Sequence, residues 1–269
     1  MKKIYLLFES LLLALIKKIP AKALAHIKQK TQIIKKMDYL RHDIFLHIDS
    51  TFEYNARLTS CGKEPETVWW IENFLKEGEV FYDIGANVGA YSLVAAKFLN
   101  NKVKIYAFEP AFMSYAQLCK NITLNNCEDN IIPIPIALSD KTAIDTFNYR
   151  SFTTGSSIHE LGRPIDHAGR TFKPFARHQI LACTLDDAIQ YFNLAMPNHI
   201  KIDVDGIELK ILKGVMKTLQ NPGIKSILLE INKGNAGARA TIEFFRNNGF
   251  RFHSEHPNDK PYNYIFTKL

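Results

Sequence analysis

The sequence predicts an α/β fold built on a doubly wound, mostly parallel sheet of seven strands. From Val80 onward, short apolar runs alternate with segments that have helical periodicity. Several of these runs, such as "KIYAF" and "SILLEI", are apolar at nearly every position, which is typical of strands covered on both faces. Regular alternation of such strands with helices predicts parallel strands joined by helical crossovers.

The elements follow in order along the chain. A helix is expected over residues 64–75, with Pro65 near its start. The expected strands span residues 80–84, 103–108, 131–138, 199–204, 225–231, 250–254 and 262–267. The expected further helices span residues 89–99, 111–125, 184–193, 207–220 and 236–248.

Positive charge is concentrated at the N-terminus. Residues 1–36 hold nine lysines and one acid, a net charge of +8, so the rest of the chain carries only −1 of the total of +7. A nearly neutral body gives no reason to expect a nucleic-acid partner. We therefore expect an N-terminal basic, amphipathic helical extension over residues 1–60 and one catalytic domain over residues 61–269.

The extension begins "MKKIYLLFESLLLALIKKIP". Its apolar stretch is shorter than the roughly 20 residues needed to span a bilayer. Three interpretations stay open: a helix lying on an anionic membrane surface, a helix packed on the domain or a partner, and a signal peptide. Glu9 within the apolar stretch counts against the signal peptide. We expect a cytoplasmic protein, with residues 1–36 as a candidate contact with the inner face of the membrane.

Residues 150–180 interrupt the alternation and are rich in Arg, Lys and His. A connection of this length in a compact domain is often a binding loop. We expect a variable substrate loop that favours an acceptor with negative charge. The candidate substrate-binding residues are His159, Arg163, His167 and Arg170.

The stretch "FYDIGANVGAYSL" describes a strand, a glycine-rich turn and a helix, which is a cofactor-binding arrangement in parallel sheets. Its spacing does not match the dinucleotide pattern GxGxxG. An acid at the turn, Asp83, suits a cofactor with a cationic group better than one with a pyrophosphate. At the end of the next strand, Glu109 can accept both hydroxyls of a ribose. These features predict S-adenosylmethionine as the cofactor.

The motifs "YDIGANVGAYSLVAA", "IPIALSDK", "IKIDVDGIELKILKGV" and "ILLEIN" resemble those of the FkbM family of S-adenosylmethionine-dependent methyltransferases, over about residues 64–252. The resemblance implies a Rossmann-like class I methyltransferase fold and methyl transfer to an oxygen. It departs from the family at Asp205, where many members have a glutamate. Carried over by position, the cofactor-binding residues are Asp83, Gly85, Ala86, Asn87, Gly89, Glu109, Ala137, Leu138, Ser139 and Glu66.

We therefore expect an O-methyltransferase that acts on a hydroxyl of a sugar, a glycan or a related small molecule. Asp203 is the first candidate for the catalytic base and Glu230 the second. Three alternatives stay open: methylation of the carboxyl group of a small acid, a non-catalytic membrane-attached protein with this fold, and an NAD-dependent oxidoreductase on the same sheet. No dedicated metal site is expected, although the acids after the two strands allow a magnesium hypothesis, on Asp203, Asp205, Glu208, Glu230 and Asn232.

Overall fold

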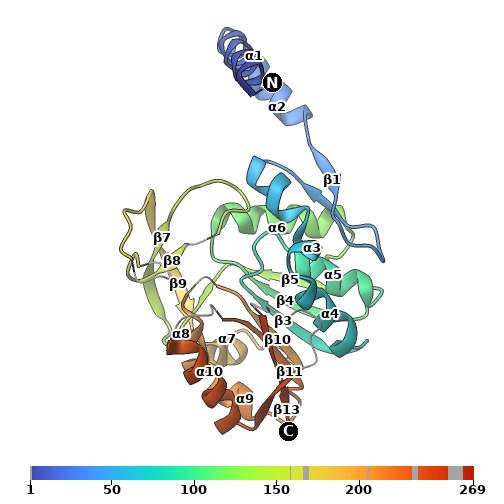
Figure 1. The fold of residues 1–269 in the computed structure, drawn as a ribbon, viewed down its shortest axis with the longest axis vertical. Coiled ribbons are helices and arrows are strands. Elements are labelled where there is room, and N and C mark those ends of the chain that lie inside the picture. The colour runs from blue at the N-terminus through green and yellow to red at the C-terminus, as the bar shows by residue number, and fades with distance from the viewer. Residues whose placement is uncertain (1, 158, 166–169, 205, 232–235, 254–262) are drawn as a thin grey trace. The chain divides into compact units, whose positions relative to one another are not determined.

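The structure is a computed structural model that describes residues 2–157, 159–165, 170–204, 206–231, 236–253 and 263–269 (Figure 1). Its contacts divide the chain into two compact units, Met1–Ile34 and Lys35–Leu269. The larger unit starts before the boundary at residue 60 that the sequence predicted. The reason is that residues 37–48 contribute buried side chains, including Met37, Ile44 and Leu46, to the core of the domain.

The first unit contains helices α1 (Lys2–Ile16) and α2 (Ala21–Lys30). Among the side chains of α1 that the structure describes, Leu11, Leu12, Leu13 and Leu15 are exposed. No described helix combines the length and the apolar character needed to cross a membrane.

The second unit opens with short elements that precede the main sheet. Strand β1 (Ile34–Lys36) pairs with β2 (Phe45–His47). A short π-helix, η1 (Glu53–Arg57), and helices α3 (Ser60–Lys63) and α4 (Pro65–Phe74) follow. Pro65 stands in the first turn of α4, where its missing N–H costs no hydrogen bond.

A seven-stranded sheet forms the centre of the second unit, in the order β12-β13-β11-β10-β3-β4-β5. Only β13 runs antiparallel to its neighbours. The predicted doubly wound, mostly parallel sheet is therefore confirmed. Its strands are β3 (Val80–Ile84), β4 (Lys104–Phe108), β5 (Ile131–Ile134), β10 (His199–Ile202), β11 (Ser226–Glu230), β12 (Phe250–His253) and β13 (Asn263–Lys268).

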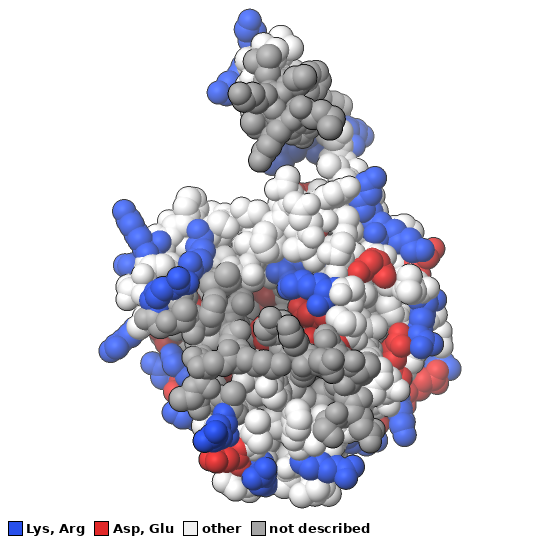
Figure 2. All heavy atoms as spheres, viewed as in Figure 1, with Lys and Arg blue, Asp and Glu red and all other residues white. Residues whose placement is uncertain are grey.

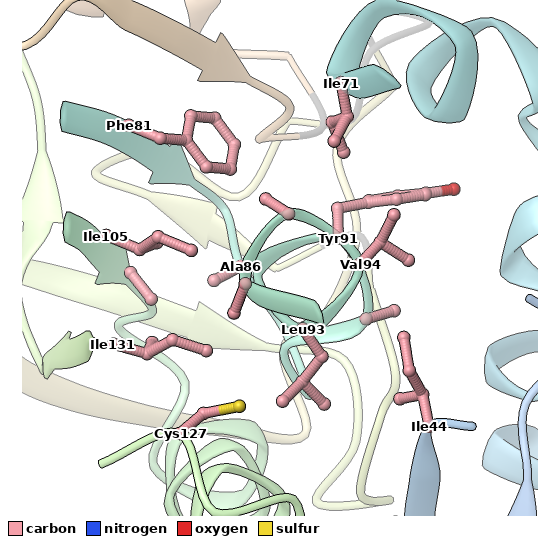
Figure 3. Packing of buried hydrophobic residues seen from close by; sticks show 14 of the residues in the cluster. Ile44, Ile71, Phe81, Ala86, Tyr91, Leu93, Val94, Ile105, Cys127 and Ile131 are labelled. Carbon is pink, nitrogen blue, oxygen red and sulfur yellow. The ribbon is translucent and has the colours of Figure 1, made fainter. Parts of the chain in front are cut away.

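Helices cover both faces of this sheet and bury two apolar clusters. Helix α4, with α5 (Ala90–Phe98) and α6 (Phe112–Leu124), packs on one face. Figure 3 shows Phe81, Ile105 and Ile131 of three neighbouring strands pointing toward the helix that carries Leu93 and Val94. The opposite face packs against α7 (Leu185–Tyr191), α8 (Glu208–Lys213), α9 (Met216–Gln220) and α10 (Ala236–Asn247). Burial on both faces explains why these strands are apolar at nearly every position.

A second sheet of four strands, in the order β6-β9-β7-β8, was not predicted. It contains β6 (Ala137–Leu138), β7 (Ala143–Tyr149), β8 (Glu160–Leu161) and β9 (Ala176–Cys183). The expected strand over residues 131–138 is thus divided between two sheets, and the expected loop over residues 150–180 includes β8 and the first half of β9. The expected helix over residues 207–220 is likewise divided into α8 and α9, at Gly214.

Candidate active site

A cleft of about 610 Å³ lies at the carboxyl ends of β3, β4 and β10. This position, beyond the carboxyl ends of parallel strands, is where such sheets bind ligands. The cleft is lined by Ile84, Gly85, Asn87, Phe108, Glu109, Pro110, Ile136, Ala137, Leu138, Phe147, Ser156, Ser157, His159, Leu161, Asp203, Val204 and Ile207.

The turn after β3 depends on glycine for packing as well as for access. Gly85 has a φ of +82°, and a Cβ there would lie 1.8 Å from the carbonyl oxygen of Asp203. Gly89 has a φ of +88°, and a Cβ there would lie 2.5 Å from Cδ1 of Leu118. The two glycines let the turn pack directly against the end of β10 and against α6. Only Gly85 lines the cleft.

Glu109, just after β4, is fixed by two backbone groups. Its Oε2 accepts a hydrogen bond from the N–H of Asn87 and its Oε1 one from the N–H of Ala111, both at 2.8 Å. Burial raises the pKa of Glu109 to about 7, although these two hydrogen bonds act in the opposite direction. Because each carboxylate oxygen has a second lone pair, both can still accept hydroxyl groups from a ligand.

Below the cleft, a buried lysine joins the ends of two neighbouring strands. Lys201 is 1% exposed, and its Nζ lies 2.9 Å from Oδ2 of Asp203 and 3.5 Å from Oδ1 of Asp83. The hydroxyl of Ser92 donates to Oδ2 of Asp83 at 2.6 Å. Asp83 is fully buried and is absent from the lining of the cleft. Its predicted contact with the cofactor stays a prediction.

Asp203, just after β10, lines the cleft in its ionised form. Burial alone would raise the pKa of this carboxyl group, but the ammonium of Lys201 and a hydrogen bond from Glu230 hold it well below its usual range. A carboxylate with so low a pKa accepts hydrogen bonds readily but is a weak base. Glu230 is absent from the lining of the cleft and forms a hydrogen bond with Asp203, which lines it.

The segment after β7 forms one wall of the cleft and is tied to two other parts of the chain. Arg57 of η1 donates from Nε and Nη2 to the carbonyl oxygen of Gly155, at 2.9 and 2.6 Å. Nδ2 of Asn87 donates to the carbonyl oxygen of Ser156 at 3.0 Å. The hydroxyl of Ser50 donates to the carbonyl oxygen of Thr154 at 2.8 Å.

His159 belongs to this wall and is uncharged at neutral pH. Burial, together with the positive charge of Arg150, lowers the pKa of His159 to about 4. Its Nδ1 accepts the backbone N–H of Arg150 at 3.3 Å, and its Nε2 lies 3.2 Å from the hydroxyl of Ser156. With both nitrogens engaged, His159 shapes the cleft. Its predicted contact with the substrate stays a prediction.

Some of the remaining predicted cofactor-binding residues line the cleft and others do not. Ala137 and Leu138 line it, whereas Ala86 and Ser139 are buried behind it. Glu66 is buried and its Oε1 accepts a long hydrogen bond of 3.4 Å from Asn263, away from the cleft lining.

The basic residues that were predicted to bind the substrate also differ in their position relative to the cleft. Arg163 lies in a neighbouring groove and Arg170 is exposed, while His167 lies outside the described residues. Within the described ranges, no group of three or more His, Cys, Asp and Glu side chains is placed to hold a metal ion. Asp205 and Asn232 of the magnesium hypothesis lie outside those ranges.

Two important residues escaped the sequence analysis. Lys201 stands in a strand that is otherwise apolar, and a lysine in such a place is the available signal, since buried lysines are almost always paired. Arg57 lies in the part of the chain that was assigned to the extension, and nothing in the local sequence marks it.

The donor and acceptor groups of the cleft fit S-adenosylmethionine. Glu109 offers two oxygens to a pair of ribose hydroxyls, and apolar Ile136 and Leu138 offer a surface for the adenine. Oδ1 of Asn87 is buried and accepts no hydrogen bond from any described residue. Such an atom is costly unless a ligand or water donates to it, and the cofactor carries both hydroxyl and ammonium donors.

Comparison with known proteins identifies similar chains. A hexuronic acid methyltransferase, AglP of Haloferax volcanii, is 24% identical over 223 residues, which cover 75% of this chain and 84% of that protein. The 31-O-demethyl-FK506 methyltransferase FkbM of Streptomyces tacrolimicus is 26% identical over 196 residues, which cover 65% of this chain and 74% of that protein.

A solved structure of an FkbM methyltransferase from Methylobacillus flagellatus aligns with a TM-score of 0.49 and 15% identity, over 72% of this chain and 44% of that longer one. The match that decides the family is a different one. Residues 83–252, well over half of the chain, match the family described as the Methyltransferase FkbM domain. The chain therefore belongs to the FkbM family of methyltransferases, and its cofactor is S-adenosylmethionine.

Proposed function

We propose that this methyltransferase transfers its methyl group to a hydroxyl oxygen of a sugar, a glycan or a related small molecule. The observation that supports this most directly is the ionised carboxylate of Asp203 in the wall of the cleft, beside Gly85. A hydroxyl can donate a hydrogen bond to this carboxylate, whereas the carboxylate of an acid substrate would be repelled by it. A hydroxyl acceptor is therefore favoured over a carboxyl acceptor.

The work of the chain in this reaction is mainly to align the acceptor oxygen with the methyl group that the bound cofactor supplies. Asp203 orients the hydroxyl by accepting its hydrogen bond. A strong base is not required, because the oxygen becomes much more acidic as its new bond to carbon forms. The proton can then pass to the weakly basic Asp203, whose hydrogen-bonded neighbour is Glu230.

The names of two similar proteins support a small-molecule or sugar acceptor. One is named for the methylation of a hexuronic acid and the other for a 31-O-demethyl compound. A hexuronic acid carries hydroxyl groups as well as a carboxyl group, so the first name does not choose between the two kinds of acceptor, and neither name mentions a nucleic acid. We extend this class of acceptor, without a particular molecule, to the present chain.

The test uses S-adenosylmethionine with a deuterated methyl group and a panel of sugar glycosides. The expected product gains one CD₃ group that survives mild alkali, because an ether resists the hydrolysis that removes a methyl ester. A label lost in alkali would show carboxyl methylation and contradict the proposal. Asp203→Asn should lower turnover at least about tenfold, while its affinity for S-adenosylhomocysteine stays close to that of the original protein.

We also propose that the first unit contacts an anionic membrane surface. The exposed leucines of α1 and the lysines near both ends of the helix support this, because apolar residues flanked by cations suit the lipid interface. Vesicles of neutral lipid with and without about one third phosphatidylglycerol test it by co-sedimentation. Binding to the anionic vesicles only, lost when residues 1–34 are removed, is the expected result. Equal recovery with and without the segment would contradict it.

A further inference from the structure

Beside the cofactor cleft lies a second, open groove of about 1040 Å³. Leu161 of β8 and Ile207, just before α8, line both cavities, so the groove adjoins the cleft directly. Its other lining residues are Asp145, Glu160, Gly162, Arg163, Ile165, Gly206 and Lys210. None of the cofactor-binding residues predicted from the sequence lies in it.

Two cations from distant parts of the sequence face this groove. Arg163 follows β8, Lys210 lies on α8, and both side chains are exposed. A Cβ on Gly162 would lie 3.9 Å from Nζ of Lys210, so this ammonium stands beside the residue that precedes Arg163. Within the described parts of the chain, neither cation forms an ion pair. Figure 2 shows Lys and Arg side chains projecting from the region of β7 to β9.

The backbone that presents Arg163 is held in place. The N–H of Gly162 donates to the carbonyl oxygen of Thr146 at 2.7 Å. The buried side chain of Asn148 donates from Nδ2 to the carbonyl oxygens of Gly162 at 2.8 Å and of Glu160 at 3.1 Å. Gly162 has a φ of +84°, which other residues adopt only with strain. The backbone just before Arg163 is therefore held in place at the edge of the groove.

The acids of the groove leave these cations available. Asp145 faces Lys141 at 3.7 Å and also accepts the N–H of Thr146 at 2.7 Å. Glu160 is only 3% exposed, so its carboxyl group is turned into the protein. Among the described residues that line the groove, Arg163 and Lys210 are the charged ones that are exposed.

We propose that this groove binds the anionic group of the methyl acceptor, a carboxylate or a phosphate, through Arg163 and Lys210. The acceptor then spans the two cavities, with its anionic group in the groove and a hydroxyl in the cleft beside Asp203. Pairing of guanidinium and ammonium groups with such anions is strong and directional. This inference rests on the proposed transfer to a hydroxyl and adds the charge of the substrate to it.

The test compares matched acceptors: p-nitrophenyl β-glucuronide, p-nitrophenyl β-glucoside and glucose 6-phosphate. Release of S-adenosylhomocysteine measures the rate for each. The double variant Arg163→Gln, Lys210→Gln is compared with the original protein on whichever charged acceptor the original protein uses more efficiently. Its KM for that acceptor should be about tenfold higher or more, and its kcat should stay within a factor of about three. KM for the glucoside and the affinity for S-adenosylhomocysteine should not change. Arg177→Gln, an exposed cation of β9 outside the groove, is the matched control and should behave like the original protein.

The comparison of the two charged acceptors shows whether the groove binds a carboxylate or a phosphate. A preference for the glucuronide identifies a carboxylate ligand, and a preference for glucose 6-phosphate identifies a phosphate ligand. A KM that is the same for charged and neutral acceptors, or that the double variant leaves unchanged, overturns the inference.

Failure of methyl transfer to all three compounds would count against the proposed function and would leave the groove to be tested by binding. Titration of the glucuronide and the glucoside, in the presence of S-adenosylhomocysteine, then decides. Tighter binding of the glucuronide that is lost in the double variant supports the groove. Equal binding of the two sugars, or a preference that the double variant keeps, rejects it.

Discussion

Glu109 is a buried residue with a pKa near neutral pH. Because burial raises its pKa to about 7, the empty site carries a proton there in part of the molecules. Ribose hydroxyls donate best to the ionised form, so binding should favour loss of that proton. We predict that the affinity for S-adenosylhomocysteine rises up to about tenfold between pH 6 and pH 8. Calorimetry in buffers of different ionisation enthalpy measures both the affinity and the proton released.

Glu109→Gln is the control for this titration. The variant should bind S-adenosylhomocysteine more weakly, with an affinity that no longer changes with pH over this range. The sign for folding is the opposite of the sign for binding. A carboxyl group with a raised pKa favours the folded state at low pH, and that contribution is lost as the pH rises through about 7. An affinity that fell between pH 6 and pH 8 would contradict the assignment of Glu109 to the ribose.

Lys201 neutralises the buried carboxylate of Asp83 and the carboxylate of Asp203 in the wall of the cleft. Lys201→Met would leave Asp83 and Asp203 without their cation, and breaking a buried pair in this way costs about 3–5 kcal/mol. Urea unfolding should show this loss, whereas Lys173→Met, at an exposed position, should stay within about 0.5 kcal/mol. Adding Asp203→Asn to Lys201→Met should recover part of the stability. A loss below about 1 kcal/mol would show that the lysine is not needed to balance these charges.

At the scale of elements, the contact between η1 and the segment after β7 closes one side of the cleft. Arg57 donates two hydrogen bonds to Gly155, and its charge also lowers the pKa of Glu109 and of Asp203. We predict that Arg57→Ala speeds amide hydrogen exchange in residues 153–157 and weakens S-adenosylhomocysteine binding about tenfold. Exchange measured by mass spectrometry checks the first effect and calorimetry the second.

Arg41→Ala is the matched control, because Arg41 makes an ion pair with Glu72 outside the cleft. This variant should leave both readings unchanged. Normal exchange at residues 153–157 in the Arg57 variant would mean that the segment is held by its other contacts alone.

The elements differ in how far the sequence determines them. Strands β3, β4, β10 and β11 were predictable because both of their faces are buried and their residues are apolar throughout. The second sheet escaped because β7 and β9 have mixed, partly exposed faces and pair with each other across about thirty residues of chain. Such pairing depends on tertiary contacts that local patterns do not contain.

The candidate active site likewise contains residues that the sequence predicts and contacts that it does not predict. Gly85, Asn87, Glu109 and Asp203 lie next to sheet ends, so the order of the elements was enough to bring them together. The contact between Arg57 and Gly155 joins η1 to a loop 98 residues further along the chain, and no local signal marks it. The pairing of Lys201 with Asp83 depends on the register between β10 and β3, which is known only from the structure.

At the scale of the whole molecule, the division into two units predicts that the domain folds without the first one. Residues 35–269 contain all the buried apolar clusters of the described chain. A chain without residues 1–34 should therefore keep its melting temperature within a few degrees and its affinity for S-adenosylhomocysteine within about twofold. Thermal unfolding and calorimetry check these values. A shortened chain that failed to fold would show that the first unit contributes to the core.

The central claim is that one cleft at the carboxyl ends of β3, β4 and β10 holds the methyl donor. A crystal structure of the chain with S-adenosylhomocysteine tests this most directly. The account predicts both ribose hydroxyls within about 2.6–3.2 Å of the Glu109 carboxylate, with the sulfur on the side of Gly85 and Asp203. A ligand bound elsewhere, or a ribose that does not touch Glu109, would contradict it.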